Sequence, residues 1–269
     1  MSHDFEDVLY REEGRVATIT INRPDRMNSF RSSNATFAGG TYEELTEAIQ
    51  RAGWNRDIGV IVLTGAGSRA FSVGGDTGDT RSKSTGRGIT GVPGEELHAA
   101  IRSVPKPVIA KVRGYAIGGG NVLVTLCDLA IASENAIFGQ VGPKMGSVDP
   151  GFGTALLSRV VGEKKAREMW FLCRRYPAAE ALAMGLINRV VPDDQLDAEV
   201  DTWCEEIANM SPTAIGIAKA SFNADSEHLR GVSALGFHAT ALYRYSAEAK
   251  EAGAAFREKR KPDFTHAKN

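Results

Sequence analysis

Two glycine-rich stretches contain backbone groups that can do chemistry without any side chain. Gly118, Gly119 and Gly120 precede an apolar helical pattern, and Gly74 and Gly75 form a second glycine loop upstream. Glycines at the start of a helix leave backbone N–H groups unbonded, and the helix dipole favours negative charge there. Such a start can hold an anion. The alternative is that the glycines only allow a helix to pack closely on a strand.

A third glycine-rich segment, residues 138–149, also carries polar side chains. Gln140, Ser147 and Asp149 lie within it. A serine hydroxyl can hydrogen-bond a carbonyl group, and a carboxylate can transfer a proton. Alternatively, Ser147 or Asp149 caps the helix expected to begin near Phe152, and Gln140 satisfies buried backbone groups.

Alternating strands and helices are expected to position these loops. Period-two alternation around Gly14 predicts a β-hairpin, and continuous apolar runs predict buried strands. The expected strands are residues 8–11, 16–21, 58–64, 108–112, 129–132 and 136–138, and the expected helices are residues 42–52, after a Thr41 cap, and 95–102. Such alternation predicts an α/β fold.

The pattern becomes mostly helical after Gly153. Helices are expected at residues 154–161, 164–173, 178–184, 196–210 and 212–222 and over most of 229–259, with one strand at 187–191. Pro212 disfavours helical geometry at Ser211 and marks a helix boundary. We therefore expect a core of residues 1–210 and a C-terminal helical region of residues 211–269.

Composition excludes several classes of partner. Among 269 residues, 32 basic and 33 acidic side chains give a net charge of −1, so neither a nucleic acid nor a membrane surface is an expected partner. Cys127, Cys173 and Cys204 lie at no metal-ligand spacing, and no metal site is expected. Without an apolar leader or a stretch of membrane-spanning length, the expected location is cytoplasmic.

Several motifs resemble those of the crotonase, or enoyl-CoA hydratase/isomerase, superfamily. They are Ile21-Asn22-Arg23-Pro24, Arg69-Ala70-Phe71-Ser72-Val73-Gly74-Gly75-Asp76, Pro105-Lys106-Pro107-Val108-Ile109-Ala110, Gly114-Tyr115-Ala116-Ile117-Gly118-Gly119-Gly120 and Ala183-Met184-Gly185-Leu186-Ile187. The resemblance implies a spiral of ββα units with a C-terminal helical trimerisation region. It also implies a homotrimer or homohexamer and an acyl-CoA thioester substrate. No tightly bound cofactor is implied, because coenzyme A enters as part of the substrate.

By this resemblance, the N–H groups of Gly75 and Gly119 form an oxyanion hole for a thioester enolate. Hydratases of the superfamily carry two glutamates that activate water, and this chain has Val122 and Gly142 at those positions. Neither residue can transfer a proton, so hydration of an alkene by the usual mechanism is not expected.

The segment from residue 139 to residue 149 resembles a subgroup that acts on C–C bonds. One member, 1,4-dihydroxy-2-naphthoyl-CoA synthase (naphthoate synthase), closes a ring, and another, 2-ketocyclohexanecarboxyl-CoA hydrolase, opens one. Ser147 and Asp149 match the catalytic Ser and Asp of the subgroup, while Gln140 and Gly142 match the bicarbonate-binding positions of the synthase.

Finer features of the sequence favour the hydrolase over the synthase, but the chain also differs from the subgroup at some positions. The synthase typically has His where this chain has Asn121. Two tyrosines of the subgroup are missing, with Ser84 and Arg244 at their positions, although Tyr243 and Tyr245 flank Arg244. A narrower or different substrate is compatible with these changes.

Further substrate contacts are expected at matched positions and in charged segments. They are Arg26, Ala70, Val73, Asp76, Thr77, Arg87, Tyr115, Tyr245 and Lys261. Alternatively, Asp76 fixes its loop through backbone N–H groups, Tyr115 is a packing residue, Arg87 belongs to a solvated charged loop, and Lys261 complements a helix dipole. Among the histidines, only His98 is a candidate for the site.

The favoured hypothesis is an acyl-CoA C–C bond hydrolase or lyase that opens the ring of a cyclic β-ketoacyl-CoA through a thioester enolate. Ring closure of the naphthoate synthase type is the first alternative. Another hydratase/isomerase-type activity and a non-catalytic CoA-binding scaffold are the others.

Overall fold

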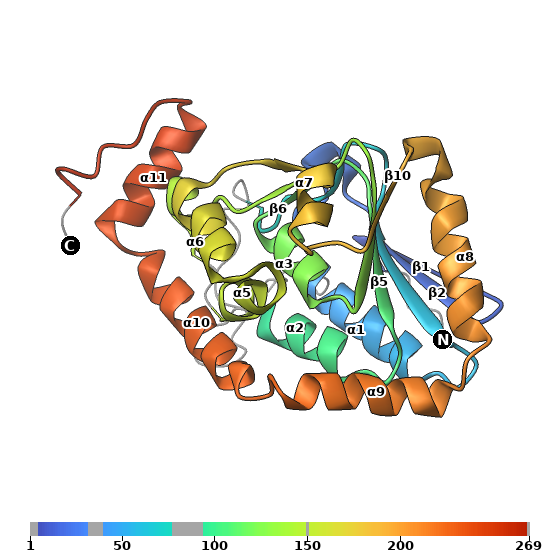
Figure 1. Cartoon of the computed structure of the whole chain (residues 1–269). Coiled ribbons are helices and arrows are strands. Elements are labelled where there is room, and N and C mark those ends of the chain that lie inside the picture. The colour runs from blue at the N-terminus through green and yellow to red at the C-terminus, as the bar shows by residue number, and fades with distance from the viewer. Residues whose placement is uncertain (1–4, 32–39, 77–93, 149–150, 268–269) are drawn as a thin grey trace.

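Two β-sheets form the centre of the fold, and helices surround them (Figure 1). The computed structural model describes residues 5–31, 40–76, 94–148 and 151–267. The larger sheet has the strand order β1-β2-β3-β5-β7-β10. Its strands are β1 (Val8–Glu13), β2 (Val16–Ile21), β3 (Val60–Gly65), β5 (Val108–Val112), β7 (Leu129–Ser133) and β10 (Arg189–Val191). Only the β1–β2 hairpin is antiparallel in this sheet.

Three of the four strands of the smaller sheet directly follow strands of the larger one. The order of the smaller sheet is β4-β6-β8-β9. The strands are β4 (Ala70–Ser72), β6 (Tyr115–Ile117), β8 (Ile137–Gly139) and β9 (Tyr176–Pro177). Because β3, β5 and β7 are each followed by a strand of the smaller sheet and then by a helix, the chain winds as a spiral of ββα units. The expected α/β fold is confirmed.

Opposite faces of the larger sheet bury different side chains. Ile61 and Leu63 of β3 belong to the main core, whereas Val60 and Val62 pack with residues of α8 (Leu196–Ala208). This is the period-two alternation of a strand buried on both faces. α8 covers one face, and α1 (Thr41–Trp54), α2 (Gly94–Ser103) and α3 (Gly119–Leu126) lie on the other (Figure 1).

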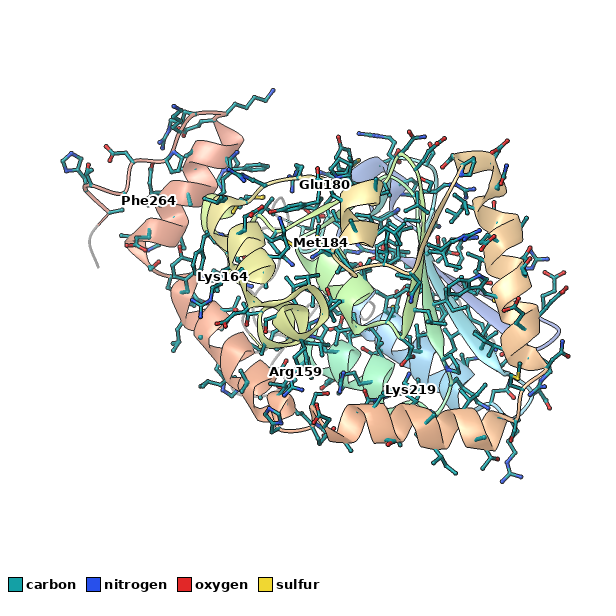
Figure 2. All side chains as sticks on the ribbon, viewed as in Figure 1. Arg159, Lys164, Glu180, Met184, Lys219 and Phe264 are labelled. Carbon is teal, nitrogen blue, oxygen red and sulfur yellow. The ribbon has the colours of Figure 1, made fainter. Side chains whose placement is uncertain are left out.

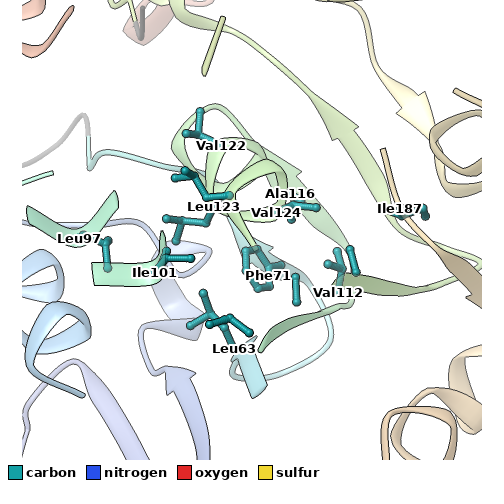
Figure 3. Packing of buried hydrophobic residues seen from close by; sticks show 14 of the residues in the cluster. Leu63, Phe71, Leu97, Ile101, Val112, Ala116, Val122, Leu123, Val124 and Ile187 are labelled. Atoms are coloured by element: carbon teal, nitrogen blue, oxygen red, sulfur yellow. The ribbon is translucent and has the colours of Figure 1, made fainter. Parts of the chain in front are cut away.

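Phe71 of β4 lies at the centre of the main core (Figure 3). Its ring is surrounded by side chains from the larger sheet and from α3, while Leu97 and Ile101 of α2 approach from the side (Figure 3). This packing fixes β4 against α3, so the glycine loops that follow β4 and β6 are held on one rigid body.

Helices make up most of the chain after residue 153. They are α5 (Ala155–Val161), α6 (Glu163–Leu172), α7 (Ala178–Ala183), α8, α9 (Pro212–Ala224), α10 (Leu229–Tyr243) and α11 (Ala247–Arg257). α9 runs across the ends of α1 and α2, and α10 continues beside α2 and α5 (Figure 1). No helix of the described ranges is long and apolar enough to cross a lipid bilayer.

A buried lysine fastens α9 to the core. Lys219, labelled in Figure 2, donates hydrogen bonds to the carbonyl groups of Ile101 (2.8 Å) and Lys106 (2.9 Å). It also forms an ion pair with Asp128 (2.7 Å). The amphipathic pattern of α9 predicted a helix but not this anchor.

One local prediction is wrong. The cap of α1 is Gly40, because the hydroxyl of Thr41 donates to Asp7 (2.6 Å) and accepts from the backbone of Arg31 (3.2 Å). The run 229–259 is mostly helical as expected and consists of two helices, α10 and α11. The Ser246 side chain accepts a hydrogen bond from Ala249 N–H (3.1 Å) and caps α11.

Candidate active site

The Gly74-Gly75 loop lies directly against the start of α3. A methyl group placed on Gly74 would sit 2.5 Å from the Gly119 nitrogen, and one placed on Gly119 would sit 3.1 Å from Gly74 Cα. Gly74 also has a φ of +79°, which other residues rarely adopt. Glycine is therefore required at position 74 by conformation and by space. Because the Gly75 nitrogen is only two bonds from Gly74 Cα, the amides of Gly75 and Gly119 are near neighbours.

Hydrogen bonds to Phe30 set the direction of the Gly75 N–H. Phe30 N–H donates to Gly74 O (2.8 Å), and Asp76 N–H donates to Phe30 O (2.8 Å). Since amide groups alternate sides along an extended chain, the Gly75 N–H points away from Phe30. Gly119 is the first residue of α3, so its N–H has no acceptor within the helix. Neither amide donates a hydrogen bond to another described residue.

A buried polar network fixes the backbone around Gly74. The Ser72 hydroxyl donates to Asn28 O (2.8 Å) and accepts from Gly74 N–H (3.1 Å). Val73 N–H donates to Met27 O (3.2 Å). The loop is thus held at successive residues, as a preorganised hydrogen-bond donor requires.

Asp76, next to Gly75, forms an ion pair with Arg23 (2.9 Å). Asp7 lies in the same cluster, 3.6 Å from Arg23 and 2.6 Å from Arg31. The side chains of Arg23, Asp7 and Asp76 are at most 13% exposed. Asp76 was expected to contact substrate or to fix its loop through backbone groups. No role was expected for Arg23 from the sequence, although it lies in the motif Ile21-Asn22-Arg23-Pro24.

The loop after β8 runs beside the start of α3. Gly118 N–H donates to Gly139 O (2.9 Å), and the next residue, Gln140, is fully buried. Neither the nitrogen nor the oxygen of the Gln140 amide has a hydrogen-bond partner among the described residues. Buried amides without partners are rare, and the Gln140 amide has a donor and an acceptor that no described residue uses. The sequence alternative, in which Gln140 satisfies backbone groups, is wrong.

Gly142 and Ser147 close the turn that follows Gln140. Ser147 N–H donates to Gly142 O (2.9 Å), and a methyl group on Gly142 would lie 2.7 Å from Ser147 O and 3.2 Å from the Trp170 ring. Gly142 is buried and begins the short helix α4 (Gly142–Met145), whereas Ser147 is exposed. The structure therefore brings Gln140, Gly142 and Ser147 into one turn. Asp149 lies outside the described residues.

The position expected for a hydratase glutamate is filled by core packing. Val122 of α3 is fully buried and belongs to the main core (Figure 3). Its neighbour Asn121 is also fully buried, with its nitrogen 3.6 Å from the Met169 sulfur and its oxygen unpartnered among the described residues. The Asn121 side-chain oxygen is thus an unsatisfied polar atom on the helix that begins at Gly119.

Two of the three cysteines are poor nucleophile candidates. Burial raises the pKa of the Cys127 thiol well above its ordinary value and that of Cys204 to about 12, so both remain protonated. In the described part of the chain, no three His, Cys, Asp or Glu side chains are grouped so that they can hold a metal ion.

The residues expected to contact substrate are differently placed. Arg26, at the end of the 3₁₀ turn Pro24–Arg26, is exposed and directly precedes Met27, which bonds Val73. Ala70 is buried, and its carbonyl accepts from the Asn28 amide (2.7 Å). Tyr115, Tyr245 and Lys261 are exposed. Thr77 and Arg87, like Ser84, lie outside the described residues.

Phe30 and Tyr42 were not expected in the site and lie next to the glycines. A methyl group on Gly119 would be 3.3 Å from the Phe30 ring, and one on Gly75 would be 3.9 Å from the Tyr42 hydroxyl. The two rings contact each other edge to face, with centroids 5.2 Å apart. Their apolar pattern alone predicts core packing, and no spacing signal linked them to the glycines.

Comparisons with known proteins agree with this geometry. The sequence model of the family described as "Enoyl-CoA hydratase/isomerase" matches residues 11–267. An enoyl-CoA hydratase from Mycobacterium avium subsp. paratuberculosis is 31% identical, with 97% of this chain and 100% of that chain covered and a TM-score of 0.85.

Two further solved structures are similar. An enoyl-CoA hydratase/carnithine racemase from Magnetospirillum magneticum is 33% identical over 97% of this chain and 96% of that one, with a TM-score of 0.73. A monofunctional enoyl CoA isomerase from M. smegmatis is 32% identical over 81% of this chain and 93% of that one, with a TM-score of 0.68. The fold, the paired glycine amides and the family match lead to one conclusion: this chain belongs to the enoyl-CoA hydratase/isomerase family, the crotonase superfamily.

Proposed function

We propose that the protein opens the ring of a cyclic β-ketoacyl-CoA by hydrolysing a C–C bond, a reaction of the 2-ketocyclohexanecarboxyl-CoA hydrolase type. The observation that carries this proposal is the pair of adjacent amides at Gly75 and Gly119 combined with non-acidic residues at positions 122 and 142. A thioester enolate needs oxyanion donors, whereas hydration of an alkene also needs carboxylates to activate water.

The proposed reaction begins when the oxygen of water attacks the ring ketone carbon and a proton passes to a base. The bond from that carbon to the α-carbon then breaks, and its electron pair forms the thioester enolate. The N–H groups of Gly75 and Gly119 donate to the enolate oxygen. Finally, a proton adds to the α-carbon, and the product is an open-chain dicarboxylic acyl-CoA. Removing one such oxyanion donor typically lowers kcat by about 10²–10³-fold.

Residues of the turn after β8 supply the remaining roles. Ser147, which is exposed beside Gly142, hydrogen-bonds the ring carbonyl. Asp149 transfers the proton, an assignment supported by its match to the subgroup. The unpartnered amide of Gln140 and the N–H of Gly142 fit a bound bicarbonate or water. Bicarbonate, when bound, supplies a base.

A hydratase or isomerase activity is the second candidate, and the printed names of the similar solved structures favour it. Ring closure of the naphthoate synthase type passes through the same kind of enolate and uses the same donors. A non-catalytic CoA-binding scaffold is motivated by Ser84 and Arg244 at the positions of the subgroup's tyrosines.

We also propose a homotrimer or a dimer of trimers, located in the cytoplasm. Large apolar side chains on the C-terminal helices support the assembly. Ile217 and Phe222 of α9 are 65% and 82% exposed, and Leu235 and Leu242 of α10 are 68% and 74% exposed. Such side chains are typical of an interface between subunits. Light scattering on the purified protein measures the mass, and a monomer would contradict the proposal.

Product analysis separates the reactions. With 2-ketocyclohexanecarboxyl-CoA, we expect a product that is heavier by one water and carries a new carboxylate. Crotonyl-CoA tests hydration, succinylbenzoyl-CoA tests ring closure, and exchange of the α-proton in deuterated water tests for an idle scaffold. Asp149→Asn should lower turnover by at least about a hundredfold while acyl-CoA binding changes little. Hydration of crotonyl-CoA without ring opening would overturn the proposal.

A further inference from the structure

A continuous row of aromatic side chains leads from the oxyanion glycines to helix α2. Phe30 lies against Gly119, and the hydroxyl of Tyr42 lies near Gly75. A methyl group on Gly94, the first residue of α2, would be 3.4 Å from the Tyr42 ring. The wall beside the glycine amides therefore extends to the beginning of α2.

Phe237 of α10 continues the row along α2. A methyl group on Gly94 would be 2.7 Å from the Phe237 ring, so only glycine leaves room for that ring. His98 follows Gly94 by four residues and lies on the same face of the helix. Its ring centroid is 5.2 Å from that of Phe237 and 6.1 Å from that of Phe152. His98 thus lies at the far end of the aromatic row.

The imidazole of His98 is a polar group in apolar surroundings. The residue is 4% exposed, and its Nδ1 atom has no hydrogen-bond partner among the described residues. Burial lowers the pKa of His98 to about 3, so the ring is neutral near pH 7 and can donate one hydrogen bond and accept another. A buried nitrogen without a partner destabilises a protein by about 1–3 kcal/mol and calls for an explanation.

We propose that this aromatic row lines the acyl-binding site and that His98 is a specificity-determining residue at its far end, where the imidazole hydrogen-bonds an oxygen-bearing substituent on the side of the acyl group remote from the thioester. This inference rests on the proposed use of a cyclic acyl-CoA. The aromatic row supplies apolar contact for a carbocycle, and His98 supplies the polar contact. A pocket with a buried polar group rejects ligands that leave that group unpaired.

Binding of two unreactive ligands tests the assignment. Cyclohexanecarboxyl-CoA and 4-oxocyclohexanecarboxyl-CoA differ by one remote ketone, and neither has the β-ketone that ring opening requires. For the wild-type protein we expect the keto ligand to bind about tenfold more tightly in calorimetry, the effect of one hydrogen bond. The ratio should fall to about one in His98→Phe and His98→Leu, while His98→Gln should retain part of it.

Ile101→Val is the matched control, because Ile101 is a fully buried residue of the same helix and the substitution removes no polar group. It should keep the wild-type ratio of the two dissociation constants. Circular dichroism establishes that each variant is folded. A wild-type ratio near one, or an unchanged ratio in folded His98→Phe or His98→Leu, would overturn the assignment. Because neither ligand reacts, this outcome is independent of whether the protein opens β-keto rings.

Discussion

Arg23 and Asp76 form an ion pair of 2.9 Å, although 53 residues separate them in the sequence. Asp76 directly follows Gly75, and its own N–H donates to Phe30 O (2.8 Å). The residue after Gly75 is therefore held through both its side chain and its backbone. Since an oxyanion donor acts only when its direction is fixed in advance, the proposed function predicts that Arg23 and Asp76 position the Gly75 N–H.

Asp76→Asn should therefore lower kcat more than it changes KM. Loss of the charge weakens the contact with Arg23 and allows the Gly75 amide to shift, and a shift of about 1 Å can lower a rate by about a hundredfold. We expect kcat to fall by about ten- to a hundredfold with KM within about twofold, measured by steady-state kinetics on the productive acyl-CoA. The control is Glu13→Gln, which removes an ion pair with Arg11 whose side chains are 74% and 75% exposed. A change in KM without a fall in kcat, or an equal fall in kcat in the control variant, would contradict this role.

Gly74→Ala should nearly abolish turnover. The new methyl group would lie 2.5 Å from the Gly119 nitrogen, and the backbone would keep a φ of +79° that alanine disfavours. We expect a loss of at least about a hundredfold in kcat and a loss of about 1–3 kcal/mol in the free energy of unfolding. Gly231→Ala is the matched control, because Gly231 lies in α10 and, apart from its chain neighbours and the backbone of that helix, no atom lies within 4 Å of the added methyl group. It should gain about 0.5–1 kcal/mol and keep full activity.

Gln140→Met should separate stability from activity. The substitution replaces an amide whose two polar atoms are buried without partners among the described residues by an apolar side chain of similar length. Removing such a group raises the free energy of unfolding by about 1 kcal/mol if only protein surrounds it. Urea unfolding in buffer free of carbon dioxide measures this gain. We expect kcat to fall at least about tenfold at the same time, and added bicarbonate to raise the rate of the wild type but not that of the variant. A less stable variant would show that protein groups hold the amide.

The elements that sequence patterns located are those with long apolar runs. β3 and β5 are almost entirely buried strands and were predicted as such, whereas β4, β6 and β9 have only two or three residues each and were not predicted. All three missed strands belong to the smaller sheet, and β4 and β6 directly precede the glycine loops. The loops themselves were recognised because glycine is the residue that close backbone approach requires.

Side-chain partners and surfaces were harder to predict. The Arg23–Asp76 pair joins distant segments, and no local pattern specifies it. Trp170 and Leu172 lie two residues apart on α6, yet Trp170 is 6% and Leu172 is 55% exposed. Leu172 is the last residue of α6, and the chain turns into a left-handed conformation at Cys173. Helical spacing predicts which face of a helix is apolar, but it does not predict how far along the helix the protein core extends.

The buried His98 should make stability depend on pH on the acid side. The folded-state pKa is lowered from 6.5 to about 3 because burial disfavours the charged ring, and the ring neighbours Phe152 and Phe237 carry no charge. Between these values the unfolded chain binds a proton that the folded protein does not. The contribution of His98 is therefore fully present above pH 6.5 and is lost as the pH falls, by up to about 1.4 kcal/mol per pH unit until about pH 3. In urea unfolding, the free energy of unfolding of the wild type minus that of His98→Phe should show this loss between pH 7 and pH 4.5. Ile101→Val should change the free energy of unfolding by the same amount at both pH values. An identical pH dependence in His98→Phe would mean that the imidazole has the same pKa in the folded protein as in the unfolded chain, so that burial does not shift it.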